Sequence, residues 1–190
     1  MKQSELITAA LKGDATLVVK NARVVNVFTN EILEGDVALS EDTIIGVGKG
    51  FAAREEIDAG GAYLCPGFID AHVHIESSMV IPDSFSRVIM PHGTTTIIAD
   101  PHEIANVCGV AGVRAIYKLS DDLPLRVLFM MPSCVPATPF ENSGATLTAE
   151  DMEQFMRKSR ILGLGEVMDA VSTINCSKDM MDKLRLFDGR

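Results

Sequence analysis

The chain has 190 residues, of which 47% are hydrophobic, and its mean hydropathy of +0.20 is typical of a protein that folds around a buried core. Its formal net charge is −9, with 26 acidic against 17 basic residues and no run rich in Lys or Arg, which argues against nucleic acid as a partner. No segment approaches the ~18 consecutive apolar residues that a membrane span needs, so we expect a cytoplasmic protein without a membrane partner.

The four cysteines are Cys65, Cys108, Cys134 and Cys176. They are widely spaced and form no C-x-x-C pair, so neither a disulfide framework nor a zinc ribbon is indicated. Reduced thiols agree with a cytoplasmic location.

Residues 1–65 predict a short N-terminal helix followed by a small all-β domain. The first fifteen residues, MKQSELITAALKGDA, are amphipathic, and residues 16–65 consist of short β-branched runs separated by Asn, Gly and Asp turns. We expect this domain to be a β-sandwich.

From residue 66 onward, strand and helix patterns alternate. The buried-strand runs GFIDAHVHI, GTTTIIAD, LRVLFMMP and RILGLGEVM begin near residues 68, 94, 125 and 161, a spacing typical of βα units. Helix starts are indicated at Pro82 and at Thr148, where Asp151 completes a capping box. A complete (β/α)8 barrel takes ~250 residues, so residues 66–190 predict an α/β fold that forms only its first four βα units.

The first of these strands carries potential metal ligands at alternate positions. In PGFIDAHVHIESSM, strand alternation places Asp70, His72, His74 and Glu76 on one side. At the C-terminal end of a barrel strand they would point into the mouth where catalytic residues of this architecture collect. Two imidazoles at i and i+2 can both reach one divalent ion, so His72 and His74 are predicted to be metal ligands.

The second strand is followed by Asp100, Pro101, His102 and Glu103. The carboxylate of Asp100 has the strand parity to enter the same mouth, and we favour Asp100 and His102 as site residues. For Glu103 the alternative is almost equally supported, since acidic residues also stabilise the first turn of a helix.

Glu166 stands near the C-terminal end of the fourth strand run, which is otherwise apolar and glycine-rich from Ile161 onward. A buried carboxylate needs a compensating charge, so Glu166 is predicted to bridge metal cations. The alternative is an ion pair with an arginine, such as Arg160 or Arg185.

Taken together, PGFIDAHVHIESSM, HGTTTIIADPHEIANV, MPSCVPATPFENSGA and LGLGEVMD resemble the amidohydrolase superfamily and, within it, the adenine deaminase family. The resemblance covers nearly the whole chain. It implies a metal-dependent barrel whose flanking β domain is built from segments before and after the barrel. It also implies a binuclear manganese or iron centre that converts adenine to hypoxanthine and ammonia.

On this resemblance, His72 and His74 are ligands of one metal and Glu166 is the bridge. Glu76, Asp100, His102 and Glu103 match acidic and imidazole positions near the site and are expected to act in catalysis. The family's further ligands, histidines of strands five and six and an aspartate of strand eight, have no counterpart before Arg190.

Three other interpretations have some basis in the sequence. The zinc deaminases of the cytidine type share H-x-E but need a downstream P-C-x-x-C, which this chain lacks. Another amidohydrolase acting on a cyclic amide is a closer alternative, although a strand-four lysine is missing. The last is an inactive fragment that binds metal weakly or needs a missing half. We expect a homo-oligomer, or self-association through the exposed edge of an incomplete barrel.

Overall fold

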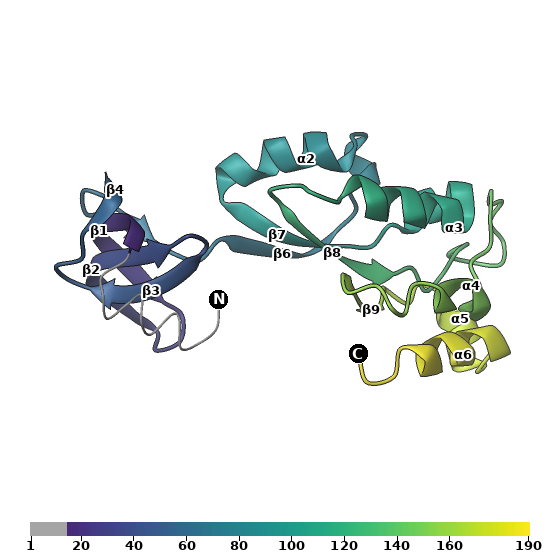
Figure 1. Ribbon diagram of the computed structural model, residues 1–190. Helices are drawn as coiled ribbons and strands as arrows, with labels where there is room; N and C mark the ends of the chain where they lie inside the picture. The colour runs from purple at the N-terminus through teal and green to yellow at the C-terminus, as the bar shows by residue number, and fades with distance from the viewer. Residues whose placement is uncertain (1–14) are drawn as a thin grey trace. The chain divides into compact units, whose positions relative to one another are not determined.

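The computed structural model describes residues 15–190, which belong to two compact units that meet in the sequence at Pro66 and Gly67 (Figure 1). The helix expected at the N-terminus lies outside the described residues. Among those residues, no helix is both long and apolar enough to cross a bilayer.

The described part of the first unit is one five-stranded sheet. Its strands are β1 (Ala15–Asn26), β2 (Glu31–Ser40), β3 (Thr43–Gly48), β4 (Ala53–Asp58) and β5 (Tyr63–Leu64). The main path runs β3-β2-β1-β4, with β5 also pairing to β1. β1 and β2 are antiparallel, whereas β4 and β5 run parallel to β1. A second sheet, which a sandwich needs, is not found among residues 15–66.

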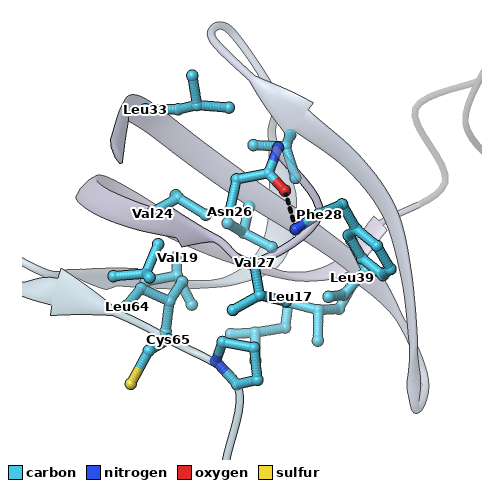
Figure 2. Close-up of a pocket in the computed structure, with 15 residues that line it drawn as sticks. Leu17, Val19, Val24, Asn26, Val27, Phe28, Leu33, Leu39, Leu64 and Cys65 are labelled. Atoms are coloured by element: carbon cyan, nitrogen blue, oxygen red, sulfur yellow. Dashed lines mark hydrogen bonds between the residues drawn. The ribbon is translucent and has the colours of Figure 1, made fainter. Parts of the chain in front are cut away.

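One side of this sheet is an apolar hollow. A cavity of ≈ 530 Å³ is lined by side chains of β1, β2 and β3 and by Leu64, Cys65 and Pro66 (Figure 2). Its lining is almost entirely aliphatic, with Leu17 and Val19 from β1 and Leu39 from β2. Phe28, which also lines it, is 95% exposed.

The second unit is built on a four-stranded, fully parallel sheet. The strands β6 (Phe68–Val73), β7 (Thr94–Ala99), β8 (Arg126–Met131) and β9 (Ile161–Leu164) follow one another in both sequence and space. Their starting residues agree within one position with those predicted from the sequence. The parallel arrangement is the one that crossover helices of this length require.

Helices connect these strands, and two further helices follow the last strand (Figure 1). They are η1 (Glu76–Ser78), α2 (Pro82–Ile89), η2 (Met90–His92), α3 (His102–Leu119), α4 (Ala149–Glu153), α5 (Ala170–Ile174) and α6 (Lys178–Leu186). The predicted capping box of α4 is confirmed. The Thr148 hydroxyl accepts from the Asp151 amide at 3.3 Å, and the Asp151 carboxylate accepts from the Thr148 amide at 2.9 Å.

The core of the second unit lies on one face of its sheet. Ile97 of β7, and Val127 and Phe129 of β8, are buried against α3, whose Val113 and Ile116 belong to the same cluster. Alternate residues of these strands, such as Ile98 and Leu128, are only partly buried. This alternation determines which side chains of each strand pack against the helices. Polar residues follow the C-terminal ends of the strands.

Candidate metal centre

The predicted site residues follow the C-terminal ends of three parallel strands. His72 lies within β6, and His74 follows that strand by one residue. Asp100 follows β7 directly, and His102 is the first residue of α3. Glu166 comes two residues after the end of β9. Parallel strands end on the same edge of the sheet, so these residues from distant parts of the sequence come together.

Three imidazoles surround the carboxylate of Glu166. Its oxygens lie 3.6 Å from Nε2 of His72, 3.4 Å from Nε2 of His74 and 3.3 Å from Nδ1 of His102. The Nε2 atoms of His72 and His74 are themselves 3.1 Å apart. The carboxylate oxygens and ring nitrogens therefore face a common space.

The arginine alternative for Glu166 is wrong. Arg160 pairs with Asp121 and donates hydrogen bonds to the backbone carbonyls of Tyr117 and Ser120. Arg185 pairs with Asp182 within α6. The groups nearest the Glu166 carboxylate are the imidazoles of His72, His74 and His102.

Asp100 is the most deeply buried of the acidic site residues, with a side chain that is 1% exposed. One carboxylate oxygen accepts a hydrogen bond from the Glu166 amide at 3.1 Å, and the other lies 3.7 Å from Nδ1 of His102. Its backbone carbonyl accepts a hydrogen bond from Nδ1–H of His74 at 2.8 Å. Asp100 thus contacts three of the other site residues, as its strand parity predicted.

Glu103 and Glu76 lie beside the first turn of α3. Glu103 is in that turn, as the capping interpretation predicts, but its carboxylate also accepts from the Ser77 hydroxyl and lies 4.0 Å from Nδ1 of His74. Glu76 accepts a hydrogen bond from the Ile104 amide at 3.2 Å. Both therefore border the centre and also stabilise the start of the helix.

The expected strand alternation through Glu76 is wrong beyond Val73. β6 ends there, and Glu76 begins the short helix η1. The backbone of Ile75 is no longer extended, and its side chain is buried in the core, where it is 0% exposed. Asp70, on the strand, accepts from the backbone amide of His72 and does not join the cluster around Glu166.

Burial raises the pKa values of two acidic groups, Asp100 and Glu76. The pKa of Asp100 is raised to about 6. For His74, burial works to lower the pKa, but the hydrogen bond to the Asp100 carbonyl and the nearby carboxylates outweigh it, so that the pKa is raised overall.

These residues fit a divalent cation. Three groups of His and acidic side chains have one potential ligand atom each within 4.8 Å of the others: His72, His74 and Glu166; His74, His102 and Glu103; and Asp100, His102 and Glu166. Among the described residues, Asp100 Oδ1, His102 Nδ1 and Glu103 Oε2 are buried without a hydrogen-bond partner. A cation would compensate atoms that are otherwise costly to bury.

The hydrogen bond of His74 is also typical of a metal ligand. Donation from Nδ1 to a backbone carbonyl fixes the tautomer in which the Nε2 lone pair is free. That lone pair faces the same space as His72 and Glu166.

Sequence reasoning missed the groups that hold the backbone of Glu166. Ser133 and Cys134 contact the segment after β9, and Gly165 lets Asp100 approach. Ser133 and Cys134 stand in the loop SCVPATPFENSGA, and nothing in its composition indicates which backbone group they bind.

Comparison with known proteins places this chain in a family. The amidohydrolase family model matches residues 63–186. The chain is 51% identical over 185 residues to an adenine deaminase of Halalkalibacterium halodurans, which covers 96% of this chain and 32% of that protein. An adenine deaminase of Desulfitobacterium hafniense is also 51% identical, over 191 residues, 100% of this chain and 33% of its own length. The chain thus spans about a third of the curated relatives it matches.

Solved structures share the fold at much lower sequence identity. Atrazine chlorohydrolase from Arthrobacter aurescens, complexed with zinc, matches with a TM-score of 0.55 and 15% identity over 74% of this chain and 42% of its own. N-acyl-D-glutamate deacylase from Bordetella bronchiseptica, complexed with zinc and a phosphonate inhibitor, matches with a TM-score of 0.51 and 17% identity over 80% of this chain and 37% of its own. With the family model matching most of its length, the chain belongs to the amidohydrolase family.

Proposed function

We propose that the protein takes part in the metal-dependent hydrolytic deamination of adenine to hypoxanthine and ammonia, and that this chain supplies part of the enzyme. The observation that carries the proposal is the carboxylate of Glu166 facing three imidazoles within 3.6 Å. The identity of 51% to proteins named adenine deaminase supports adenine as the substrate.

The proposed cofactor is a binuclear centre of Mn²⁺ or Fe²⁺. His72 and His74 would hold one ion, and Glu166 would bridge to the second. When bound, such a cation acts as a Lewis acid that lowers the pKa of water from 15.7 toward 7. Nitrogen and oxygen donors of this kind suit Mn²⁺ or Fe²⁺, whereas the four cysteines, three of them exposed, supply no thiolate here.

The chain's own acids would move the protons. Deamination forms a C6–O bond and breaks the C6–N bond, so that water loses two protons: one goes to the departing amino group, which leaves as ammonia, and the other goes to the purine ring. Asp100, whose carboxylate accepts from the Glu166 amide and lies 3.7 Å from Nδ1 of His102, is one candidate for this proton transfer. Glu76 and Glu103, beside the first turn of α3, are the other candidates. His102 would orient Asp100 and Glu166, which lie 3.7 and 3.3 Å from its Nδ1.

The fold proposed for the full-length protein is a (β/α)8 barrel, of which residues 66–190 are the first four βα units, with a β-sandwich domain that includes residues 1–65. The partly buried second face of the β6–β9 sheet supports a barrel interior. The apolar hollow of the β1–β5 sheet supports a covering second layer (Figure 2). Cytoplasmic location and a homo-oligomeric state are part of the same proposal.

Activity of the full-length protein tests the function. Loaded with Mn²⁺, it should convert adenine to hypoxanthine with release of ammonia, measured by chromatography of both purines. His72→Ala and Glu166→Gln should reduce turnover by at least about 10²-fold, because each removes a ligand on which the chemistry depends. The 190-residue chain by itself should show negligible turnover.

Parallel assays with dihydropyrimidines and hydantoins separate adenine from cyclic-amide substrates. Turnover of those compounds together with inert adenine would contradict the proposal and establish the cyclic-amide alternative. Robust adenine turnover by the isolated chain would instead contradict the proposal that it is only part of the enzyme.

A further inference from the structure

Glu166 lies on a segment without regular secondary structure. β9 ends at Leu164 and α5 begins at Ala170, so the backbone of residues 165–169 is not held by a strand or helix ladder. A carboxylate that must keep a fixed position needs its backbone held by other groups.

Two neighbouring strands provide those groups. The Gly165 amide donates to the Met131 carbonyl at 2.7 Å, and the Glu166 amide donates to the Asp100 carboxylate at 3.1 Å. On the opposite side of the same residue, the Ser133 hydroxyl donates to the Glu166 carbonyl at 2.5 Å. The backbone N–H and C=O of Glu166 are therefore both bound by side chains.

A short chain of hydrogen bonds continues from Ser133. Its hydroxyl oxygen is 3.1 Å from Sγ of Cys134, and that sulfur accepts from the Asp169 amide at 3.2 Å. The hydroxyl hydrogen of Ser133 is directed to Glu166, so the thiol of Cys134 is the donor between the two side chains. Ser133 and Cys134 are 1% and 3% exposed, which keeps water from replacing these bonds.

We propose that Ser133 is a positioning residue: its hydroxyl, supported by Cys134, fixes the backbone of Glu166 so that the carboxylate faces His72, His74 and His102. The consequence for cation binding rests on the function proposed above. The effect on the backbone of residues 166–169 is independent of that proposed function.

The test uses Ser133→Ala, with Ser133→Thr to restore the hydroxyl and Ser120→Ala as the matched control. Ser120 is also buried, 4% exposed, and its hydroxyl donates to the Ile116 carbonyl at 2.8 Å, at the C-terminal end of α3 and away from the cluster. Both alanine variants lose one buried hydroxyl-to-carbonyl hydrogen bond, but only Ser133→Ala loses it at Glu166.

Amide hydrogen exchange of the metal-free protein, followed by NMR, gives the first measurement. We expect the Glu166 amide to exchange about 5- to 10-fold faster in Ser133→Ala, the factor that corresponds to one hydrogen bond. In Ser120→Ala its rate should be unchanged, and in Ser133→Thr it should return toward the wild-type rate. Unchanged exchange in Ser133→Ala overturns the proposal, whatever the protein does with metal.

Titration with Mn²⁺ gives the second measurement. We expect Ser133→Ala to bind Mn²⁺ about 5- to 10-fold more weakly than wild type and Ser120→Ala to bind it equally well. Faster exchange with equal Mn²⁺ affinity would overturn the positioning of the carboxylate. A wild-type protein that binds no Mn²⁺ would overturn the proposed function, while the exchange result would still decide whether Ser133 holds the backbone.

Cys134→Ala keeps the proposal testable if Ser133→Ala does not fold. It removes the sulfur that accepts from Asp169 but leaves the Ser133 hydroxyl in place. We expect faster exchange at Asp169 and a smaller increase at Glu166, because the Ser133 hydroxyl that holds the Glu166 carbonyl loses the thiol that supports it. Unchanged exchange at Asp169 would contradict the hydrogen-bonded chain.

Discussion

At the scale of single residues, the carboxylate of Glu166 is the group that all three imidazoles of the candidate metal centre approach. The carboxylate lies within 3.6 Å of nitrogens from three histidines, and two of these, His74 and His102, have side chains only about one-fifth exposed. A neutral group of the same shape would keep the packing and lose the charge. The substitution Glu166→Gln therefore removes the charge of the side chain while keeping its shape.

We predict that Glu166→Gln lowers the affinity for Mn²⁺ by at least about tenfold, since loss of even an outer partner of a metal site costs 10- to 100-fold. Isothermal titration of the purified protein measures the change. Glu153→Gln, on an exposed position of α4, is the control and should bind Mn²⁺ like wild type. Equal affinity in both variants would remove Glu166 from the ligand set.

At the scale of elements, the end of β9 must pass close to the end of β7. A Cβ at Gly165 would lie 2.0 Å from the Asp100 carboxylate and 3.1 Å from the Met131 carbonyl. At Gly163, within β9, a Cβ would lie 3.3 Å from the flexible end of Met130 and 3.8 Å from the Arg190 carbonyl oxygen, which is ordinary van der Waals contact. A methyl group is therefore tolerated more easily at Gly163, within β9, than at Gly165, just beyond its end.

We predict that Gly165→Ala lowers the free energy of unfolding by about 1–3 kcal/mol, because the added methyl forces the Asp100 carboxylate and the backbone apart. Gly163→Ala should change it by less, since the Met130 side chain can rotate away. Urea denaturation of both variants makes the comparison. A larger loss for Gly163→Ala would show that the Gly165 contact is not the limiting one.

The capping box at the start of α4, formed by Thr148 and Asp151, makes a contribution to the stability of the fold that can be measured. Hydrogen bonds from the Thr148 amide and hydroxyl lower the pKa of Asp151. An acid whose folded-state pKa is lowered stabilises the fold above its unfolded pKa, and this stabilisation is lost as the pH falls through the folded pKa.

Thr148→Ala should therefore reduce the free energy of unfolding by about 1 kcal/mol at pH 7. The difference from wild type should shrink below pH 3.8, the ordinary pKa of the carboxyl, as Asp151 is protonated. Denaturation across this pH range checks the sign. A difference that grows as the pH falls would contradict the box as the source of the stabilisation.

At the scale of the whole molecule, each unit leaves apolar surface open. In the first, Phe28 is 95% and Ile44 61% exposed beside the apolar cavity. In the second, Phe68 and Ile69 of the edge strand β6 are 58% and 65% exposed. Such surfaces in water favour association.

We predict that the purified 190-residue chain self-associates, with a sedimentation coefficient that rises with protein concentration. Phe28→Lys should shift it toward monomer, because a charge would be placed on the apolar face of the first unit. Ile174→Lys, at a position of α5 that is 79% exposed, is the control and should leave the association unchanged. A chain that stays monomeric at tens of micromolar would contradict the prediction.

The sequence by itself determined the second unit well, because its signals are local. Apolar runs at intervals of 26 to 36 residues predict the parallel strands, and the Thr148–Asp151 pair predicts a helix start. The choice of His72, His74, Asp100, His102 and Glu166 follows from polar residues at strand ends. β4 was missed because four of its six residues are charged, and its strand conformation depends on pairing with β1.

Only the tertiary structure decided how these residues are partnered. Register between β7, β8 and β9 brings Glu166 to imidazoles rather than to Arg160, and it places Asp100 against the Glu166 amide. The turn of Ile75 into the core separates Glu76 from the strand, against the alternation pattern. The local sequence pattern determines the backbone conformation of a residue and the side of the strand on which its side chain lies. The distances between the ends of different strands depend instead on how segments far apart in the sequence pack together.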